Sequence, residues 1–199
     1  GVQVWGPGAG ALASGRTGVG RMIEPEQVAA LALAKLRAPK VDLRGLKVLI
    51  TAGPTWEALD PVRILSNRST GTMGLALARA AAVRGAEVEL VLGPTHLADP
   101  AGVTTTRVES AEQMLAAVQA RLPCDILIGA AAVSDYRPAE AQAQKLKRSD
   151  PRAQQLALAE NPDVLATAAR QAGTGTTIVG FAAETQDLEA HAQAKLARK

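Results

Sequence analysis

The sequence predicts an α/β protein with a Rossmann-like three-layer domain built on a mainly parallel sheet. Short apolar runs alternate with helical patterns along most of the chain, which is typical of β-α-β units. Hydrophobic residues make up 47% of the 199 residues but aromatic residues only 2%, so small aliphatic side chains must form a core of helices packed closely on a sheet. A Ser/Thr/Gly-rich turn after the first apolar run opens into an alanine-rich helix, where such sheets bind phosphates.

The first forty residues are expected to lie outside this sheet. Residues 1–20 are rich in glycine, which loses more conformational freedom on folding than any other residue, so we predict a loop or a tail there. A helix is predicted over 26–36, followed by a linker over 39–45. The chain therefore divides into a tail with its linker, residues 1–42, and a domain, residues 43–199.

Helices and strands alternate within the domain. Gly85 is expected to end the first helix as a left-handed cap, and Ser110 with Gln113 has the capping-box spacing that begins the second. A third helix is predicted to start with Asn161 as its cap and Pro162 at its first position. The predicted strands are residues 47–52, 87–92, 104–108, 125–131 and 176–181.

Two segments near the end of the chain depart from this alternation. The connection 134–160 is long and polar and has no clear strand, so we interpret it as a functional flap. A last helix is predicted from about Asp187 to Lys199 without a stop signal, and the domain is expected to be truncated there.

Composition and charge exclude several classes of function. The 22 basic and 19 acidic residues are spread along the chain without a basic block, which argues against nucleic-acid binding. No run of about 18 apolar residues is present and the start lacks the parts of a signal peptide, so we predict a cytoplasmic protein with no membrane partner. The single cysteine, Cys124, excludes an intramolecular disulfide and fits a structural role in a reducing compartment.

The turn from Asn67 to Gly74 is the strongest local signal for a ligand site. Its glycines let the backbone approach an anion, its hydroxyl groups donate hydrogen bonds, and the N–H groups of the helix start carry partial positive charge. The same residue types also form ordinary turns and caps, so the turn by itself leaves both interpretations open.

A series of ordered motifs spans the domain, at residues 52–55, 59–63, 66–71, 130–136, 145–148, 161–164 and 180–185. With these motifs, residues 48–199 closely resemble the phosphopantothenoylcysteine synthetase domain of the bifunctional bacterial coenzyme A biosynthesis proteins. Residues 8–25 resemble the closing segment of the flavin-dependent decarboxylase domain that precedes the synthetase in those proteins. The resemblance implies an excised synthetase domain, with FMN bound only by the absent decarboxylase domain.

The resemblance implies a ligase that joins 4'-phosphopantothenate to cysteine with CTP. In the family the carboxylate attacks the α-phosphate, pyrophosphate leaves, and the cysteine amine displaces CMP from the acyl-cytidylate. Lys145 matches the catalytic lysine, whose charge would stabilise the first step. Asn67 matches the asparagine that holds the carboxylate and the acyl phosphate. Arg63 and Ala132 match positions in the pantothenate pocket, which both subunits of a homodimer build.

The resemblance also implies a CTP site. The positions that match its residues are Gly53, Ser69, Gly71, Gly129, Ala130, Ala131, Asp135, Lys145, Asn161, Pro162, Asp163, Val164, Phe181, Lys195 and Lys199. Among them, Asp135 can accept a hydrogen bond from an amino group or a ribose hydroxyl, and Phe181 offers an apolar face. Mg²⁺ is expected to arrive with the triphosphate, because no His, Asp or Glu cluster has the spacing of a dedicated metal site.

Each of these assignments has a structural alternative. Lys145 can be a solvated loop residue, Asn67 a turn former or helix cap, and Arg63 an exposed surface residue. Asp135 can cap the start of a helix, and Phe181 can be a core residue at the end of a strand.

Three departures from the family pattern leave other functions open. Thr72 stands where a basic residue is usual, Ser14 replaces the catalytic cysteine of the decarboxylase, and the chain ends at Lys199 before the arm that makes the dimer. One alternative is therefore a module that binds CTP without turnover. A second is a nicotinamide-dependent oxidoreductase, which is disfavoured because the turn lacks the G-x-G-x-x-G spacing and no acidic residue closes the second strand.

Overall fold

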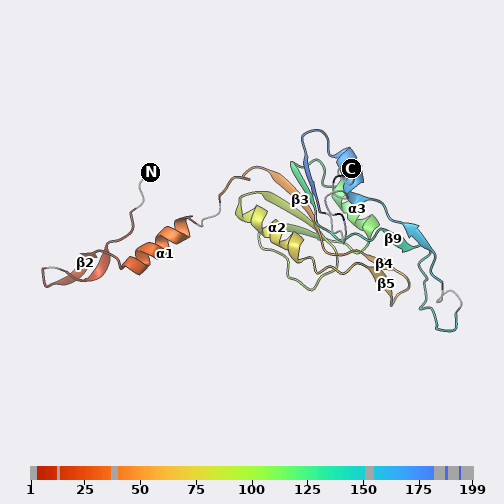
Figure 1. Cartoon of the computed structure of the whole chain (residues 1–199), viewed down its shortest axis with the longest axis horizontal. Coiled ribbons are helices and arrows are strands. Elements are labelled where there is room, and N and C mark those ends of the chain that lie inside the picture. The colour runs from red at the N-terminus through yellow and green to blue at the C-terminus, as the bar shows by residue number, and fades with distance from the viewer. Residues whose placement is uncertain are drawn as a thin grey trace. The chain divides into compact units, whose positions relative to one another are not determined.

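Five parallel strands form one sheet in the order β11-β8-β3-β6-β7 (Figure 1). The computed structural model describes residues 4–12, 14–36, 40–150, 155–181, 187 and 193. The strands of the sheet are β3 (Lys47–Ala52), β6 (Glu87–Leu92), β7 (Thr104–Arg107), β8 (Ile126–Gly129) and β11 (Thr177–Gly180). They match the five predicted strands closely, and the predicted α/β class with a parallel sheet is confirmed.

Helices cover both faces of this sheet and give the domain three layers. In β3, Val48 and its alternate neighbours pack against α2 (Thr72–Val83), whereas Leu49 packs on the opposite face with α3 (Ala111–Gln119) and α4 (Val164–Gln171). A strand that buries both of its faces needs a nearly continuous apolar run, which is the pattern that predicted β3. The core of the domain therefore lies on both sides of the central strands.

The helix ends agree with the sequence in two cases and differ in one. Gly85 follows α2 with a φ of 90°, and Ser110 begins α3 with the complete capping box, so both predictions are confirmed. The prediction that Asn161 caps α4 is wrong, because Asp163 is the cap and its carboxylate accepts the backbone N–H of Ala166 at 2.9 Å. The amide of Asn161 binds a different part of the chain, as described below.

Two short antiparallel ribbons extend from the sheet. One pairs β4 (Trp56–Ala58) with β5 (Ile64–Ser66), and the other pairs β9 (Tyr136–Pro138) with β10 (Leu158–Glu160). The second ribbon corrects the prediction that the connection 134–160 has no strand. Each of these strands has only three residues, which is too short to display the alternation by which strands are recognised in a sequence.

The N-terminal unit, residues 1–40, is separated from the unit 41–199 by the pattern of contacts within the chain. Strands β1 (Gly8–Ala11) and β2 (Thr17–Arg21) form an antiparallel hairpin, so the prediction of a loop or tail is wrong there. Backbone hydrogen bonds can pair glycine-rich strands without any apolar pattern. Helix α1 (Pro25–Leu36) confirms the predicted helix.

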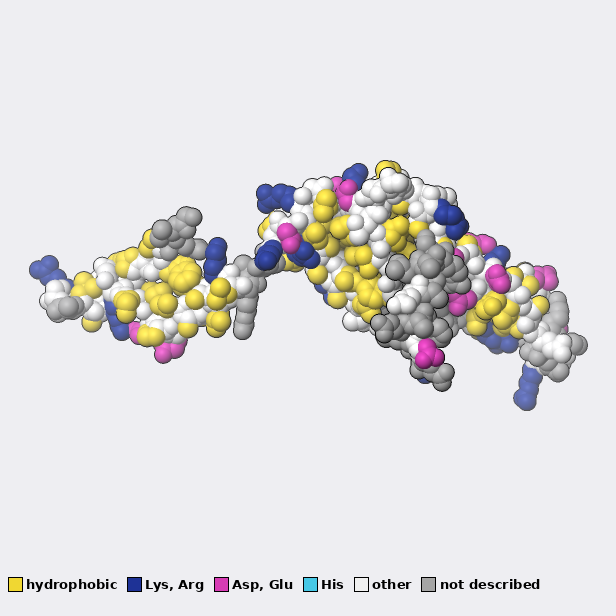
Figure 2. Space-filling model, turned by 45° about the horizontal axis from the view of Figure 1, so that its top comes forward, with side chains coloured by type: hydrophobic (Ala, Val, Ile, Leu, Met, Phe, Trp, Pro, Cys, Tyr) yellow, Lys and Arg dark blue, Asp and Glu magenta, His cyan; other side chains and the backbone are white. Residues whose placement is uncertain are grey.

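None of the described residues in the N-terminal unit is buried. Figure 2 shows hydrophobic side chains across the visible surface of this unit, and those of Met22, Leu33 and Leu36 are among the exposed ones. The hairpin and the helix thus satisfy their backbone groups without forming an apolar core of their own.

The predicted helix from Asp187 to Lys199 lies outside the described residues, apart from positions 187 and 193. Among the helices that are described, none combines the length and the apolar character needed to cross a membrane.

Candidate active site

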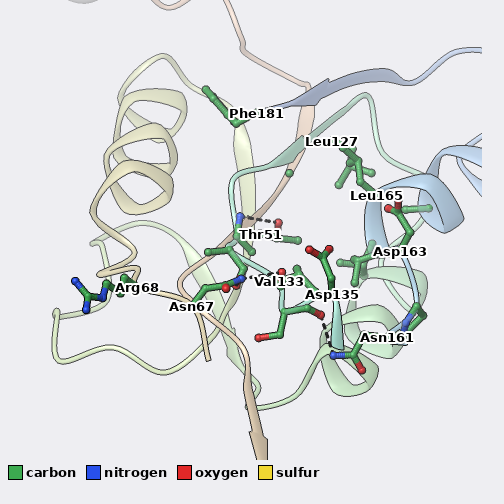
Figure 3. Close-up of a pocket in the computed structure, with 18 residues that line it drawn as sticks. Thr51, Asn67, Arg68, Leu127, Val133, Asp135, Asn161, Asp163, Leu165 and Phe181 are labelled. Carbon is green, nitrogen blue, oxygen red and sulfur yellow. Dashed lines mark hydrogen bonds between the residues drawn. The ribbon is translucent and has the colours of Figure 1, made fainter. Parts of the chain in front are cut away.

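A cleft of about 680 Å³ opens at the carboxyl ends of β3 and β8 (Figure 3). Parallel α/β sheets bind ligands at this edge, where the strand ends and the loops that follow them converge. The predicted residues that line the cleft are Asn67, Gly129, Ala131, Ala132, Asp135, Asn161, Pro162, Asp163, Val164 and Phe181. Residues from four separate motifs therefore meet in one place.

The wall of the cleft is the segment 130–134, which continues the line of β8 beside β3. The backbone N–H of Ala130 donates to the carbonyl of Thr51 at 3.1 Å, and that of Ala132 donates to the carbonyl of Gly53 at 2.9 Å. The hydroxyl of Thr55 accepts the N–H of Ser134 at 3.0 Å. This ladder fixes the wall through its backbone, so its position depends little on the small side chains that it carries.

Asn67 joins the end of β5 to this wall. Its Nδ2 donates to the carbonyl oxygens of Ala132 at 3.3 Å and Val133 at 3.0 Å (Figure 3). Two carbonyl acceptors identify this atom as the amide nitrogen. The cap of α2 is Gly71 and not Asn67, so the alternative of Asn67 as a helix cap is wrong. Its exposed side chain instead forms part of the cleft.

Asn161 closes the opposite side of the cleft. Its Nδ2 donates to the carbonyl of Ser134 at 2.8 Å, and its backbone N–H donates to the carbonyl of Asp135 at 2.8 Å. These two bonds explain why Asn161 does not cap α4. Asp135 precedes β9 rather than a helix, so its alternative as a helix cap is also wrong, and its exposed carboxylate lies beside Val133 in the cleft.

The start of α2 forms a second hollow beside the cleft, lined by residues 68–74 and Ala130. The cap residue Gly71 has a φ of 79° and makes no side-chain cap bond, and the hydroxyl of Thr70 accepts the N–H of Thr72 at 3.4 Å. The hydroxyl of Ser69 accepts the N–H of Gly71 at 3.3 Å. Ser69, Gly71 and Ala130 therefore lie where the sequence predicted phosphate binding, at a helix start whose cap residue is a glycine.

Gly53 and Gly74 each allow a close approach between neighbouring segments, Gly74 between α2 and β3 and Gly53 between the turns after β3 and β6. A Cβ on Gly74 would lie 2.3 Å from the Cβ of Ala52, and one on Gly53 would lie 3.0 Å from the carbonyl oxygen of Gly93. Gly53 is buried and does not line the cleft. Gly53 thus lets the turns after β3 and β6 approach each other closely.

Lys145 and Arg63 do not line the cleft. Lys145 is exposed on the loop between β9 and β10, where it lines a hollow formed by that loop itself. Arg63, which is half-buried, binds Asp60 and the carbonyl of Leu146. The structure thus joins Arg63 to the loop of Lys145, but it does not bring either residue together with Asn67 and Ala132.

Arg68 and Asp60 are two residues of the site region for which the sequence predicted no role. Arg68 lines both the cleft and the hollow at the start of α2, and among the described residues it is the only Lys or Arg that lines either of them. Asp60 is buried, and its hydrogen bonds with Arg63 hold the pKa of the carboxyl well below its ordinary range. Both residues lie inside motifs on which the resemblance rests, so the motifs were the signal that could have identified them.

The remaining candidates lie at or beyond the edges of the site. Phe181 lines the cleft after the end of β11 and is 43% exposed, so its alternative as a core residue is wrong. Lys195 and Lys199 lie outside the described residues. Cys124 is buried away from the cleft lining as a free thiol, and burial raises its pKa. Within the described ranges, no group of three or more His, Cys, Asp or Glu residues is placed to hold a metal ion.

The parallel sheet, the cleft at the carboxyl ends of its central strands and the helix start beside it define a Rossmann-like α/β domain with the layout of a nucleotide site. The chain belongs to the DNA/pantothenate metabolism flavoprotein C-terminal domain family, whose profile matches residues 43–199. The predicted resemblance is thereby confirmed.

Similar proteins of known name support the same assignment. The chain is 47% identical over 201 residues to the coenzyme A biosynthesis bifunctional protein CoaBC of Vibrio parahaemolyticus and 44% identical over 202 residues to that of Escherichia coli K12. In both cases the match covers 100% of this chain and 50% of the relative, so the chain spans about half the length of these proteins.

A solved structure gives the same relationship in three dimensions. A crystal structure of the C-terminal domain of CoaBC is similar to this chain with a TM-score of 0.68 and 43% sequence identity. The match covers 78% of this chain and 74% of that domain. The shared fold is therefore that of the C-terminal half of the bifunctional relatives.

Proposed function

We propose that residues 43–199 form a phosphopantothenate–cysteine ligase domain that makes 4'-phosphopantothenoylcysteine in coenzyme A biosynthesis. The observation that carries the proposal is the cleft at the carboxyl ends of β3 and β8, in which residues of separate family motifs meet. The names of the relatives, which are coenzyme A biosynthesis proteins, support the same pathway. Residues 1–42 would then be the end of a preceding decarboxylase domain with its linker, and the protein would work in the cytoplasm.

The cleft and the hollow beside it suit the two ends of a nucleoside triphosphate. The N–H groups at the start of α2 and the guanidinium of Arg68 would hold phosphates. The exposed carboxylate of Asp135 and the ring of Phe181 would seat the nucleoside. CTP is the nucleotide that the family resemblance implies, and Mg²⁺ would arrive bound to its phosphate oxygens as part of the substrate.

The reaction would proceed in two steps that share the residues of the cleft. First, a carboxylate oxygen of 4'-phosphopantothenate attacks the α-phosphorus of CTP, and the bond to pyrophosphate breaks. Then the amine of cysteine attacks the acyl carbon, an amide bond forms, and CMP leaves with the bonding electron pair. Both steps build negative charge on phosphate oxygens, which positive groups and N–H donors stabilise.

Lys145 and Asn67 would supply these stabilising groups. Lys145 is carried by the ribbon of β9 and β10, which leaves the cleft between Asp135 and Asn161, and its ammonium would act on the phosphates in the first step. Asn67 can donate from Nδ2 without adding a negative charge beside the carboxylate. In the family a second copy of the domain completes the pantothenate pocket, so we propose a homodimer as the active form.

The first test is pyrophosphate release by this chain with 4'-phosphopantothenate and Mg²⁺, comparing CTP with ATP. Release that requires the acid and prefers CTP, with amide formation only when cysteine is added, is the expected result. If calorimetry detects CTP binding but no pyrophosphate is released, the chain is a nucleotide-binding module without turnover, which is the alternative function. Absence of both release and CTP binding contradicts the assignment of the cleft.

A further inference from the structure

The loop between β9 and β10 is fastened to the turn between β4 and β5 at Leu146. The backbone N–H of Leu146 donates to Oδ2 of Asp60 at 3.1 Å, and the guanidinium of Arg63 donates to the carbonyl of Leu146 at 3.1 Å. Leu146 is buried, in contrast to its exposed neighbours 143–145 and 147–149. Both backbone groups of one residue are therefore held by a single pair of side chains.

The carboxylate of Asp60 is built into the turn from which it acts. Its Oδ1 accepts the backbone N–H groups of Val62 and Arg63, both at 2.9 Å, and its Oδ2 accepts Nε of Arg63 at 2.9 Å. The side chain of Asp60 is 0% exposed. A buried carboxylate with this many donors has one stable orientation, because any rotation would leave N–H groups unpaired.

Lys145 directly precedes this anchored residue. Consecutive Cα atoms are about 3.8 Å apart, so a fixed Leu146 restricts the backbone of Lys145 to a small volume. The conformational entropy of this part of the loop is then lost when the protein folds rather than when the substrate binds. A second bond, from the N–H of Gln142 to the carbonyl of Leu59 at 2.9 Å, holds the same loop against the same turn.

We infer that Asp60 is a positioning residue for Lys145, which acts through the backbone of Leu146, and that Arg63 completes this anchor. The inference deepens the proposed function and rests on it, because Lys145 matters to turnover only if it acts on the phosphates. It also gives Arg63 a role that differs from the predicted place in the pantothenate pocket. Its Nε and one of its terminal nitrogens are already bound within the protein.

The test compares Asp60→Asn and Arg63→Lys with Asp42→Asn as a matched control. The side chain of asparagine has one acceptor oxygen in place of two. Asp60→Asn therefore cannot accept hydrogen bonds from the amides of the turn, from Arg63 and from Leu146 at the same time. The ammonium of Arg63→Lys keeps the charge but lacks the planar fork that reaches both Asp60 and Leu146. Asp42 forms a similar pair with Arg84, at 2.6 and 2.8 Å, far along the chain from the loop.

Two readouts are measured on each variant: amide hydrogen exchange along the chain and the kinetics of pyrophosphate release. We expect exchange at Leu146 to rise about tenfold or more in Asp60→Asn, with the amides of β3 unchanged. We expect kcat to fall about tenfold with little change in KM for CTP, because binding depends on the cleft while positioning depends on the anchor. Arg63→Lys should show both effects more weakly, and Asp42→Asn neither.

The outcomes separate this inference from the proposed function. Unchanged exchange at Leu146 in Asp60→Asn overturns the anchor, and so does faster exchange without any loss of kcat. A rise in KM for 4'-phosphopantothenate in Arg63→Lys, with kcat preserved, would overturn the anchoring role of Arg63 and indicate that it lies in the pantothenate pocket. If Lys145→Gln releases pyrophosphate at the normal rate, the proposed role of Lys145 fails and the catalytic part of the inference falls with it, whatever the exchange shows.

Discussion

The wall of the cleft and the loop that carries Lys145 are positioned in different ways. The wall, residues 130–134, continues the direction of β8 and is bonded along its length to the end of β3 and the chain that follows it. The loop is held to the turn between β4 and β5 through Gln142 and Leu146. The first arrangement follows from the sheet itself, whereas the second depends on a few contacts.

This difference separates the two properties that the proposed function needs. Binding depends on residues whose place is fixed by the core, so it should be lost only when the sheet or α2 moves. Under the proposed function, turnover would depend in addition on the charged side chain of Lys145 on an appended loop, so it should be lost by changes that leave binding and stability intact. Variants in each of the two regions test this separation of binding from turnover.

The largest effect is expected from Lys145→Gln. Glutamine keeps most of the length of the side chain but removes the charge that would stabilise the phosphates, so pyrophosphate release should fall about a hundredfold to a thousandfold. The side chain is exposed, so the melting temperature and CTP binding should stay unchanged. A quenched time-course assay measures the rate of pyrophosphate release, and calorimetry measures the affinity for CTP.

The matched control for this variant is Lys147→Gln, an exposed lysine two residues away on the same loop. It should retain most of the activity. If both variants lose activity equally, the loop contributes through its overall charge and not through a placed ammonium, and the distinction between the two regions weakens.

Asn67→Asp should have the next largest effect, about a hundredfold on turnover. The carboxylate cannot donate to the carbonyl oxygens of Ala132 and Val133, which lie 3.3 and 3.0 Å from the amide nitrogen, and it would repel both a substrate carboxylate and a phosphate. Because Asn67 is exposed, the protein should remain folded. Unchanged turnover in a steady-state assay would restrict Asn67 to a structural role in the wall.

Gly74→Ala tests whether the binding region depends on the packing of α2 against the core. The new methyl group would lie 2.3 Å from the Cβ of Ala52, so α2 must move away from β3 at a cost of about 1–3 kcal/mol in the free energy of unfolding. CTP affinity should fall with it, because the start of α2 borders the cleft. Urea unfolding and calorimetry provide the measurements, and Gly175→Ala is the control, because no described residue other than its chain neighbours lies within 4 Å of the new methyl.

How far the sequence predicted this molecule depended on the range of the contacts involved. The strands of the sheet and the capping box of α3 are local patterns and were predicted. The residues of the cleft were grouped through the resemblance to the family, and they meet in the structure because the carboxyl ends of parallel strands share one edge. In the N-terminal unit, the hairpin of β1 and β2 was not predicted. Backbone hydrogen bonds pair its two strands, and the glycine-rich sequence has no apolar alternation that would indicate them.

The rest of the site is positioned by contacts between segments that are far apart in the sequence. Such contacts produce no local sequence pattern from which they could be predicted. The amide of Asn161 binds Ser134, 27 residues away, which moves the cap of α4 to Asp163. Asp60 binds Leu146 across 86 residues, so its role could not be read from the turn in which it lies. The cleft could therefore be predicted from the sequence more completely than the anchor of the loop.

The smallest effect concerns the dependence of the Asp60 anchor on pH. The guanidinium of Arg63 holds the pKa of the Asp60 carboxyl below its ordinary value of 3.8 in the folded protein. A carboxyl whose folded pKa is lowered contributes stability that is fully present above the unfolded pKa and is lost as the pH falls toward the folded one. The stability difference between the wild type and Asp60→Asn should therefore be constant from about pH 7 to pH 5 and shrink below about pH 4. Urea unfolding of both proteins across this range measures the difference, and a gap that stays constant or widens in acid would show that the carboxylate is not the charged partner of Arg63.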